Sequence, residues 1–170
     1  MDQNPPVSPN DRALAFLRIG VGCLFLIFAE YKVAEGPSVW SAAFTGWIER
    51  FLAEGAYPAM RPILHGFVLP HSAGLSWLVA YGELALGLSL VLGVWVRLAS
   101  VWGTVYMLAL LFSSNYPGPH AAPWQYFGAS LDHLVLALCF VAFVVGRPAR
   151  VLSLEHALRQ AADHRRTGVA

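Results

Sequence analysis

Three ionisable side chains lie inside or at the edge of long apolar stretches of this sequence. Glu83 and Asp132 each interrupt a run of hydrophobic residues, and Lys32 comes near the end of another. Charges in an apolar setting are unfavourable unless they pair or have a function. A carboxylate can accept and release a proton, and an amine can pair with a carboxylate. These residue types therefore fit either proton transfer or a structural ion pair.

Composition restricts the setting of these residues. The chain has 170 residues, of which 57% are hydrophobic and 12% are charged. A soluble domain usually carries about a quarter charged residues, so this composition favours a membrane protein. The net charge is +1 with acids and bases mixed, which gives no indication of a nucleic-acid partner. Cys23 and Cys139 lie far apart among apolar residues, which favours packing over disulfide or zinc chemistry.

Four apolar stretches are long enough to cross a bilayer, which requires about 20 residues for a thickness of roughly 30 Å. They cover residues 13–34, 75–96, 98–114 and 123–146. We therefore predict an all-α integral membrane four-helix bundle. Between the first two stretches, large apolar residues recur at helical spacing, which predicts an extracytoplasmic amphipathic helix. These residues are Trp40, Phe44, Trp47, Phe51 and Leu52.

Basic residues are concentrated at one set of predicted helix ends. They are Arg12, Arg97, Arg147 and Arg150, followed by Arg159, Arg165 and Arg166 in the tail. Because basic residues at helix ends favour the cytoplasm, we predict that both termini are cytoplasmic. Residues 1–12 are predicted to form a disordered leader, residues 13–147 the membrane domain, and residues 148–170 an amphipathic tail.

The depths of the ionisable residues follow from a rise of 1.5 Å per helical residue. If Arg97 and Arg147 lie at the inner boundary, Glu83 is ~21 Å and Asp132 ~22 Å above it. Lys32 approaches from the opposite chain direction, and its flexible side chain can reach toward both acids. We therefore predict a polar cluster of Lys32, Glu83 and Asp132 that joins three helices.

Two other groups of ionisable residues have simpler interpretations. Arg18 lies ~9 Å inside the inner boundary with no acid at its depth. It is predicted to extend toward lipid phosphate, and binding of an anionic ligand is the alternative. His65, His71, His120 and His133 all fall on the outer side but lack the close spacing of metal ligands, so no metal site is predicted.

The stretch "GELALGLSLVLGVWVRLAS" resembles the second-helix signature of the DoxX family. Glu83 and Gly87 open it, and Gly93 and Arg97 close it. "LRIGVG" with Lys32 is similar to the family's first helix, and "SLDHLVLAL" to its fourth. The resemblance implies a multi-pass protein of the bacterial cytoplasmic membrane. Relatives implied by it include a membrane subunit of thiosulfate:quinone oxidoreductase, other redox-associated membrane proteins and, more distantly, an animal receptor chaperone.

Two functions of different class follow from these observations. In the first, the chain is a membrane subunit of a redox complex that binds a quinone or a small anion within the bundle. Lys32 or His133 would then hydrogen-bond the quinone, with Arg18 as a further ligand-binding candidate, and Glu83 and Asp132 would transfer protons. In the second, the chain is a scaffold or assembly factor, and the charged cluster only fixes helix register. Membrane lipid and another protein subunit are the expected partners.

Overall fold

The computed structural model describes residues 7–34, 36–127, 132–146, 148–158 and 161. The described chain is helical, and its long helices are α1 (Pro9–Ala34), α4 (Ser72–Leu92) and α5 (Val96–Ser114). Each of these three helices is long and apolar enough to cross a membrane. They confirm three of the four predicted spans.

The fourth predicted span, residues 123–146, is divided in the structure. It contains a short 3-10 helix, η3 (Pro123–Phe127), and the apolar helix α6 (Asp132–Val145). Residues 128–131 lie outside the described part of the chain. At 14 residues, α6 is shorter than a typical membrane span, so a fourth crossing stays a prediction.

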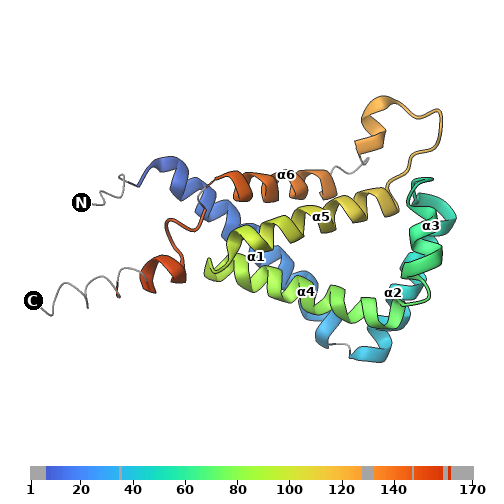
Figure 1. The fold of residues 1–170 in the computed structure, drawn as a ribbon, viewed down its shortest axis with the longest axis horizontal. Helices are drawn as coiled ribbons and strands as arrows, with labels where there is room; N and C mark the ends of the chain where they lie inside the picture. Colours follow the sequence, from blue (N-terminus) through green and yellow to red (C-terminus); the bar gives the residue numbers. More distant parts are fainter. Residues whose placement is uncertain (1–6, 35, 128–131, 147, 159–160, 162–170) are drawn as a thin grey trace, which may run out of the picture.

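The long helices form two antiparallel pairs (Figure 1). α4 packs along α1, and α6 packs along α5, while fewer contacts join one pair to the other. Close approach within the first pair depends on glycine, because a Cβ atom on Gly22 would lie 2.9 Å from Leu90 Cβ and 3.0 Å from the Val91 backbone nitrogen. The core between the pairs is apolar, with the rings of Phe25 and Phe140 5.5 Å apart.

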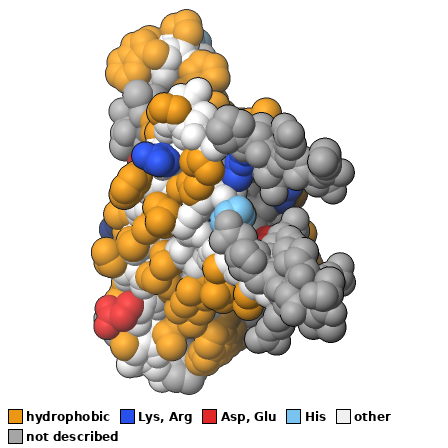
Figure 2. Space-filling model, turned by 90° about the vertical axis from the view of Figure 1, so that its left-hand side faces the viewer, with side chains coloured by type: hydrophobic (Ala, Val, Ile, Leu, Met, Phe, Trp, Pro, Cys, Tyr) orange, Lys and Arg blue, Asp and Glu red, His pale blue; other side chains and the backbone are white. Residues whose placement is uncertain are grey.

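The start of α1, the turn between α4 and α5, and the end of α6 lie at the same end of the molecule (Figure 1), which we call the terminal end. The opposite end, called the far end, carries α2 (Pro37–Arg50), α3 (Arg61–Ile63) and two π-helical turns, η1 (Phe51–Gly55) and η2 (Leu64–Val68). α2 is the amphipathic helix predicted between the first two spans. Viewed at the terminal end, hydrophobic side chains cover much of the described surface, with a few basic ones among them (Figure 2).

Two helix boundaries differ from the predictions. α1 begins at Pro9, inside the predicted leader, because the Ser8 and Asp11 side chains cap its first turn: Ser8 N donates to Asp11 Oδ2 (2.9 Å) and Asp11 N to Ser8 Oγ (3.2 Å). α4 ends at Leu92 rather than at residue 96, since Gly93 adopts the left-handed conformation (φ 72°) that terminates helices.

The segment after α6 folds back against the terminal end. Arg150 Nη1 lies 3.3 Å from Asp11 Oδ2, so this segment is paired with the first turn of α1. Residues 154–158 are helical, with Leu154 and Leu158 exposed. A helix lies within the tail predicted for residues 148–170, whose amphipathic character stays a prediction, and residues 159, 160 and 162–170 lie outside the described part of the chain.

Candidate functional site

Lys32 and Glu83 form an ion pair between α1 and α4, as their charge and relative depth predicted. The Lys32 ammonium donates a hydrogen bond to Glu83 Oε2. The two side chains are only 9% and 6% exposed. Lys32 lies in the last turn of α1, where the helix dipole also favours a positive charge. A charge pair this well buried is costly to separate.

Tyr106 of α5 completes this site. Its phenol donates a 2.6 Å hydrogen bond to Glu83 Oε1, so each carboxylate oxygen has a partner. We call Lys32, Glu83 and Tyr106 the buried triad, in which the charged pair is buried and Tyr106 is half-buried. Glu83 and Tyr106 both lie near the middle of their helices, and their hydrogen bond joins the two helix pairs.

Aromatic rings of α1 and α2 surround the Lys32 ammonium. Nζ lies 5.0 Å from the ring centroid of Trp40 and 5.6 Å from that of Tyr31, within the range of cation–π attraction. Trp40 is buried, and its indole N–H donates a 2.7 Å hydrogen bond to the Ser76 carbonyl at the start of α4. α2 is thereby anchored over the ion pair and shields it from water.

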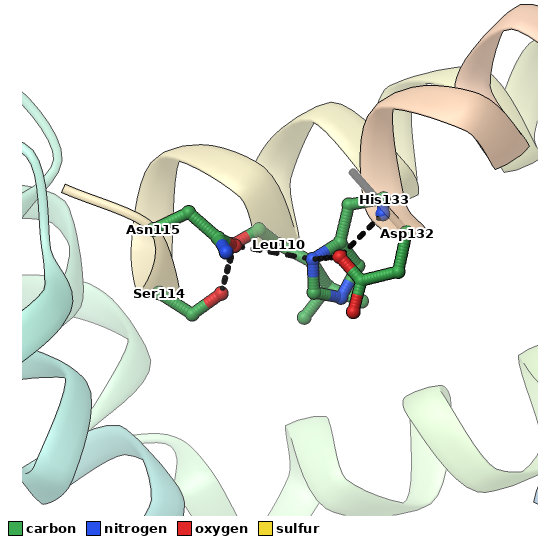
Figure 3. Close-up of polar contacts among 5 residues, drawn as sticks. All are labelled: Leu110, Ser114, Asn115, Asp132 and His133. Atoms are coloured by element: carbon green, nitrogen blue, oxygen red, sulfur yellow. Dashed lines mark hydrogen bonds and ion pairs between the residues drawn. The ribbon is translucent and has the colours of Figure 1, made fainter. Parts of the chain in front are cut away.

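Asp132 and His133 belong to a second polar site at the far end (Figure 3). Asp132 Oδ1 lies 3.3 Å from His133 Nδ1, which lies 3.1 Å from Asn115 Oδ1. The Ser114 hydroxyl is 2.7 Å from Asn115 Oδ1. The Asp132 side chain is 55% exposed, in contrast with that of Glu83. We call Ser114, Asn115, Asp132 and His133 the far-end polar site.

The predicted common depth of Glu83 and Asp132 is therefore wrong. Glu83 contacts α5 at Tyr106 and His133 contacts it at Asn115, and nine helical residues separate these positions by ~14 Å. Part of the error arises at Gly93. Because α4 ends at Leu92, Glu83 is only ~14 Å from the end of its helix, whereas Asp132 is ~20 Å from the end of α6.

Arg18 does not extend to lipid, contrary to the prediction. It is 0% exposed, and its guanidinium lies at the carboxyl end of α4. Nη1 donates to the Leu90 carbonyl and, at 3.5 Å, to that of Val91. Nη2 donates to the Leu152 carbonyl at 2.6 Å. The last carbonyls of a helix have no partner within it and carry a negative partial charge, so a buried arginine satisfies them here.

The arginine also fixes the segment after α6. Leu152 adopts a left-handed conformation (φ 52°), which costs about 1–2 kcal/mol for an L-residue. A Cβ on Gly93 would lie 2.3 Å from Ser153 Cβ and 2.6 Å from Arg18 Nη1. Glycine is thus required at position 93 for two reasons: the left-handed backbone conformation there and the close packing of the segment after α6.

We expect Arg18→Met to lower the free energy of unfolding by about 2–3 kcal/mol, because it leaves buried carbonyls without donors. The segment after α6 should also become more sensitive to protease. Thermal unfolding and limited proteolysis in detergent measure both effects. Arg12→Met is the matched control, since Arg12 lies on the same helix and is exposed. Equal stability of the two variants would contradict the role of Arg18 in satisfying the buried carbonyls.

Sequence reasoning missed Tyr106 and Trp40 as members of the site. Its spacing places Trp40 on the outer amphipathic stripe, but in the structure Trp40 is 5% exposed and its ring lies over Lys32. The available signal for Tyr106 was its hydroxyl within an apolar helix, because a buried tyrosine usually has a hydrogen-bond partner. No spacing rule connects residues 83 and 106, which meet only because the chain reverses at Gly93.

Comparison with known proteins identifies the family. The family model described as DoxX matches residues 13–115. This range contains the buried triad and Arg18 and ends before Asp132 and His133, so the resemblance of the fourth helix is not part of the match. No curated protein and no solved structure matches the chain.

Proposed function

The chain belongs to the DoxX family of membrane proteins, and we propose that it is the membrane subunit of a bacterial redox complex that binds a quinone at the buried triad. One observation carries the proposal: an amine, a carboxylate and a phenol are hydrogen-bonded together among apolar helices. Ionisable groups at this depth are unfavourable and are therefore expected to serve a function.

The donors of the triad fit a quinone headgroup. A quinone carbonyl needs hydrogen-bond donors, and the Lys32 ammonium has three N–H groups, of which one bonds Glu83. The Tyr106 phenol can turn from Glu83 toward a ligand that enters between the helix pairs. When bound, the quinone would accept two electrons and two protons.

The side chains of the triad supply the proton chemistry. Glu83 would take up a proton from the aqueous side when Lys32 or Tyr106 turns to the ligand, and it would pass that proton to the oxygen of the reduced quinone when the original hydrogen bonds re-form. The positive charge of Lys32 stabilises negative charge next to it, and this effect is strong because Trp40 excludes water. A small anion would bind the same ammonium through ion pairing.

The far-end polar site is proposed to exchange protons with water. The side chains of Asp132 and His133 are more exposed than those of Lys32 and Glu83, so water can reach them. Along α5 they lie ~14 Å from Tyr106, so their role is separate from that of the triad, which would hold the quinone. Asp132 and His133 thus act at the aqueous boundary.

The membrane and the partner are also proposed. We place the chain in the bacterial cytoplasmic membrane with both termini in the cytoplasm, supported by the arginines at helix ends and by the shared position of the start of α1 and the end of α6 (Figure 1). Electrons would come from a second protein subunit. The DoxX match and the sequence resemblance to redox-associated relatives support a partner of this class.

The proposal predicts that the protein purified from bacterial membranes in mild detergent retains a quinone. We expect Lys32→Met combined with Tyr106→Phe to reduce the retained quinone by roughly tenfold, which corresponds to about 1.4 kcal/mol of lost affinity. Tyr81→Phe is the matched control, because Tyr81 is exposed on α4. The measurement is solvent extraction followed by quantitative mass spectrometry. Equal quinone content in the wild type, the double variant and Tyr81→Phe would contradict the proposal.

A scaffold is the second candidate function, favoured by the closed hydrogen bonding of the triad. Both Glu83 oxygens are occupied, and Lys32 is paired and covered by Trp40. Such a network can fix helix register without chemistry. Stable co-purification of a partner with no quinone and no redox centre in the complex would favour the scaffold.

A further inference from the structure

A pocket of about 440 Å³ lies at the far end, outside the buried triad. Its walls come from the end of α2, from η1 and from the end of α5, and Arg50, Glu54 and Asn115 are among its lining residues. This volume is within the range of small-molecule sites. The pocket combines a cation, an anion and amide groups with the aromatic ring of Trp47.

The walls of the pocket are fixed by hydrogen bonds. Tyr57 N donates to the Phe112 carbonyl (2.9 Å) and Tyr116 N to the Gly55 carbonyl (2.8 Å), which ties η1 to the end of α5. Asn115 is held by Ser114 and His133 through its side-chain oxygen (Figure 3). Its side-chain NH2 group has no partner among the described residues, and it can donate to a ligand.

The two charges of the pocket are available. Arg50 stacks over Trp47 at 5.3 Å, which orients the guanidinium. Within the described part of the chain, no ion pair joins Arg50 to Glu54, although they are four residues apart, and both are exposed. The pocket therefore presents a positive and a negative group side by side.

The pocket lies at the level expected for lipid headgroups. α5 has 19 residues, and its length of ~29 Å matches the hydrocarbon thickness of a bilayer. Ser114 at its end, which lines the pocket, is therefore at the membrane boundary. Exposed aromatic residues of this region, Trp47, Trp124 and Phe127, are typical of that boundary.

We propose that this pocket binds the phosphoethanolamine headgroup of a membrane phospholipid. The Arg50 guanidinium and the Asn115 amide donate to the phosphate, and Glu54 accepts hydrogen bonds from the primary ammonium. Phosphatidylglycerol lacks the ammonium, and Glu54 repels its net negative charge. The quaternary ammonium of phosphatidylcholine cannot donate a hydrogen bond to Glu54. The pocket thus selects a zwitterion with a primary amine, independently of any quinone function.

Lipid binding to the purified full chain, measured by native mass spectrometry, tests the proposal. The probes are phosphatidylethanolamine, phosphatidylcholine and phosphatidylglycerol with identical acyl chains, and water-soluble glycerophosphoethanolamine. We expect phosphatidylethanolamine to bind roughly tenfold more tightly than the other lipids. Glu54→Gln should remove this preference, because it removes the acceptor of the ammonium, whereas Arg50→Gln should weaken the binding of all three lipids, because each carries the phosphate. Arg97→Gln and Glu49→Gln should retain it, since both residues are exposed and neither lines the pocket.

Three results would overturn the proposal. Equal affinity for the three lipids in the wild-type chain would exclude headgroup selection. Retained preference in Glu54→Gln, or unchanged affinities in Arg50→Gln, would place the binding site elsewhere. Binding of glycerophosphoethanolamine as tight as that of the lipid would show that a soluble ester, rather than a membrane lipid, is the ligand. Thermal unfolding of each variant confirms that the comparison is made between folded proteins.

Discussion

Glu83→Leu is expected to lower the free energy of unfolding by about 3–5 kcal/mol, which is typical of removing one partner of a buried ion pair. The substitution leaves the Lys32 ammonium beside the Trp40 and Tyr31 rings without its carboxylate. It also removes the acceptor of the Tyr106 phenol. Lys32→Met should have an effect of similar size, because it leaves Glu83 charged and buried.

The double variant distinguishes pairing from independent contributions. Lys32→Met with Glu83→Leu removes both charges, and apolar replacements of a buried pair are often nearly neutral. We therefore expect the double variant to unfold at a higher temperature in detergent than either single variant. Tyr106→Phe should have a smaller effect of about 1–2 kcal/mol, since the ion pair remains. Strictly additive losses for the Lys32 and Glu83 substitutions would mean that the pair contributes nothing.

The spans and the Lys32–Glu83 pair could be predicted from sequence because both depend on simple regularities. Long apolar runs mark α1, α4 and α5, and two opposite charges in neighbouring apolar helices strongly favour pairing. The depth of Asp132 could not be predicted, because the apolar run through Val94 and Val96 conceals the end of α4. Only the conformation of Gly93 places that end.

The environment of Arg18 shows a different limit of sequence reasoning. Its partners are backbone carbonyls of Leu90, Val91 and Leu152, and a carbonyl has no signature in the amino-acid sequence. The sequence has no acid at the depth of Arg18 and therefore favours a lipid partner for it. The end of a neighbouring helix can accept the same hydrogen bonds.

The second large effect is expected in electron transfer. Glutamine keeps the size and most of the hydrogen-bonding capacity of glutamate but cannot titrate. Glu83→Gln should leave the protein folded and assembled with its partner, because the amide oxygen can still accept from Lys32. If Glu83 transfers protons, quinone reduction by the complex should fall by roughly a hundredfold, a usual contribution of one general acid–base group.

Asp132→Asn provides an internal comparison for this effect. Asp132 lies at the far-end polar site, ~14 Å from the level of Tyr106, and its side chain is exposed. Water can replace an exposed carboxylate in proton exchange, so we expect a smaller decrease in quinone reduction than for Glu83→Gln. An effect of equal size would mean that both carboxylates lie on one obligatory proton path.

The most direct test of the central claim is quinone reduction by the purified complex carrying Glu83→Gln, measured beside its assembly on native gels. The proposed function predicts an intact complex whose rate of quinone reduction is roughly a hundredfold lower than that of the wild type. An intact complex with full activity would contradict proton transfer by Glu83 and leave the Lys32–Glu83 pair with a structural role only. The Glu49→Gln complex, altered at an exposed carboxylate of α2, should reduce quinone at the wild-type rate.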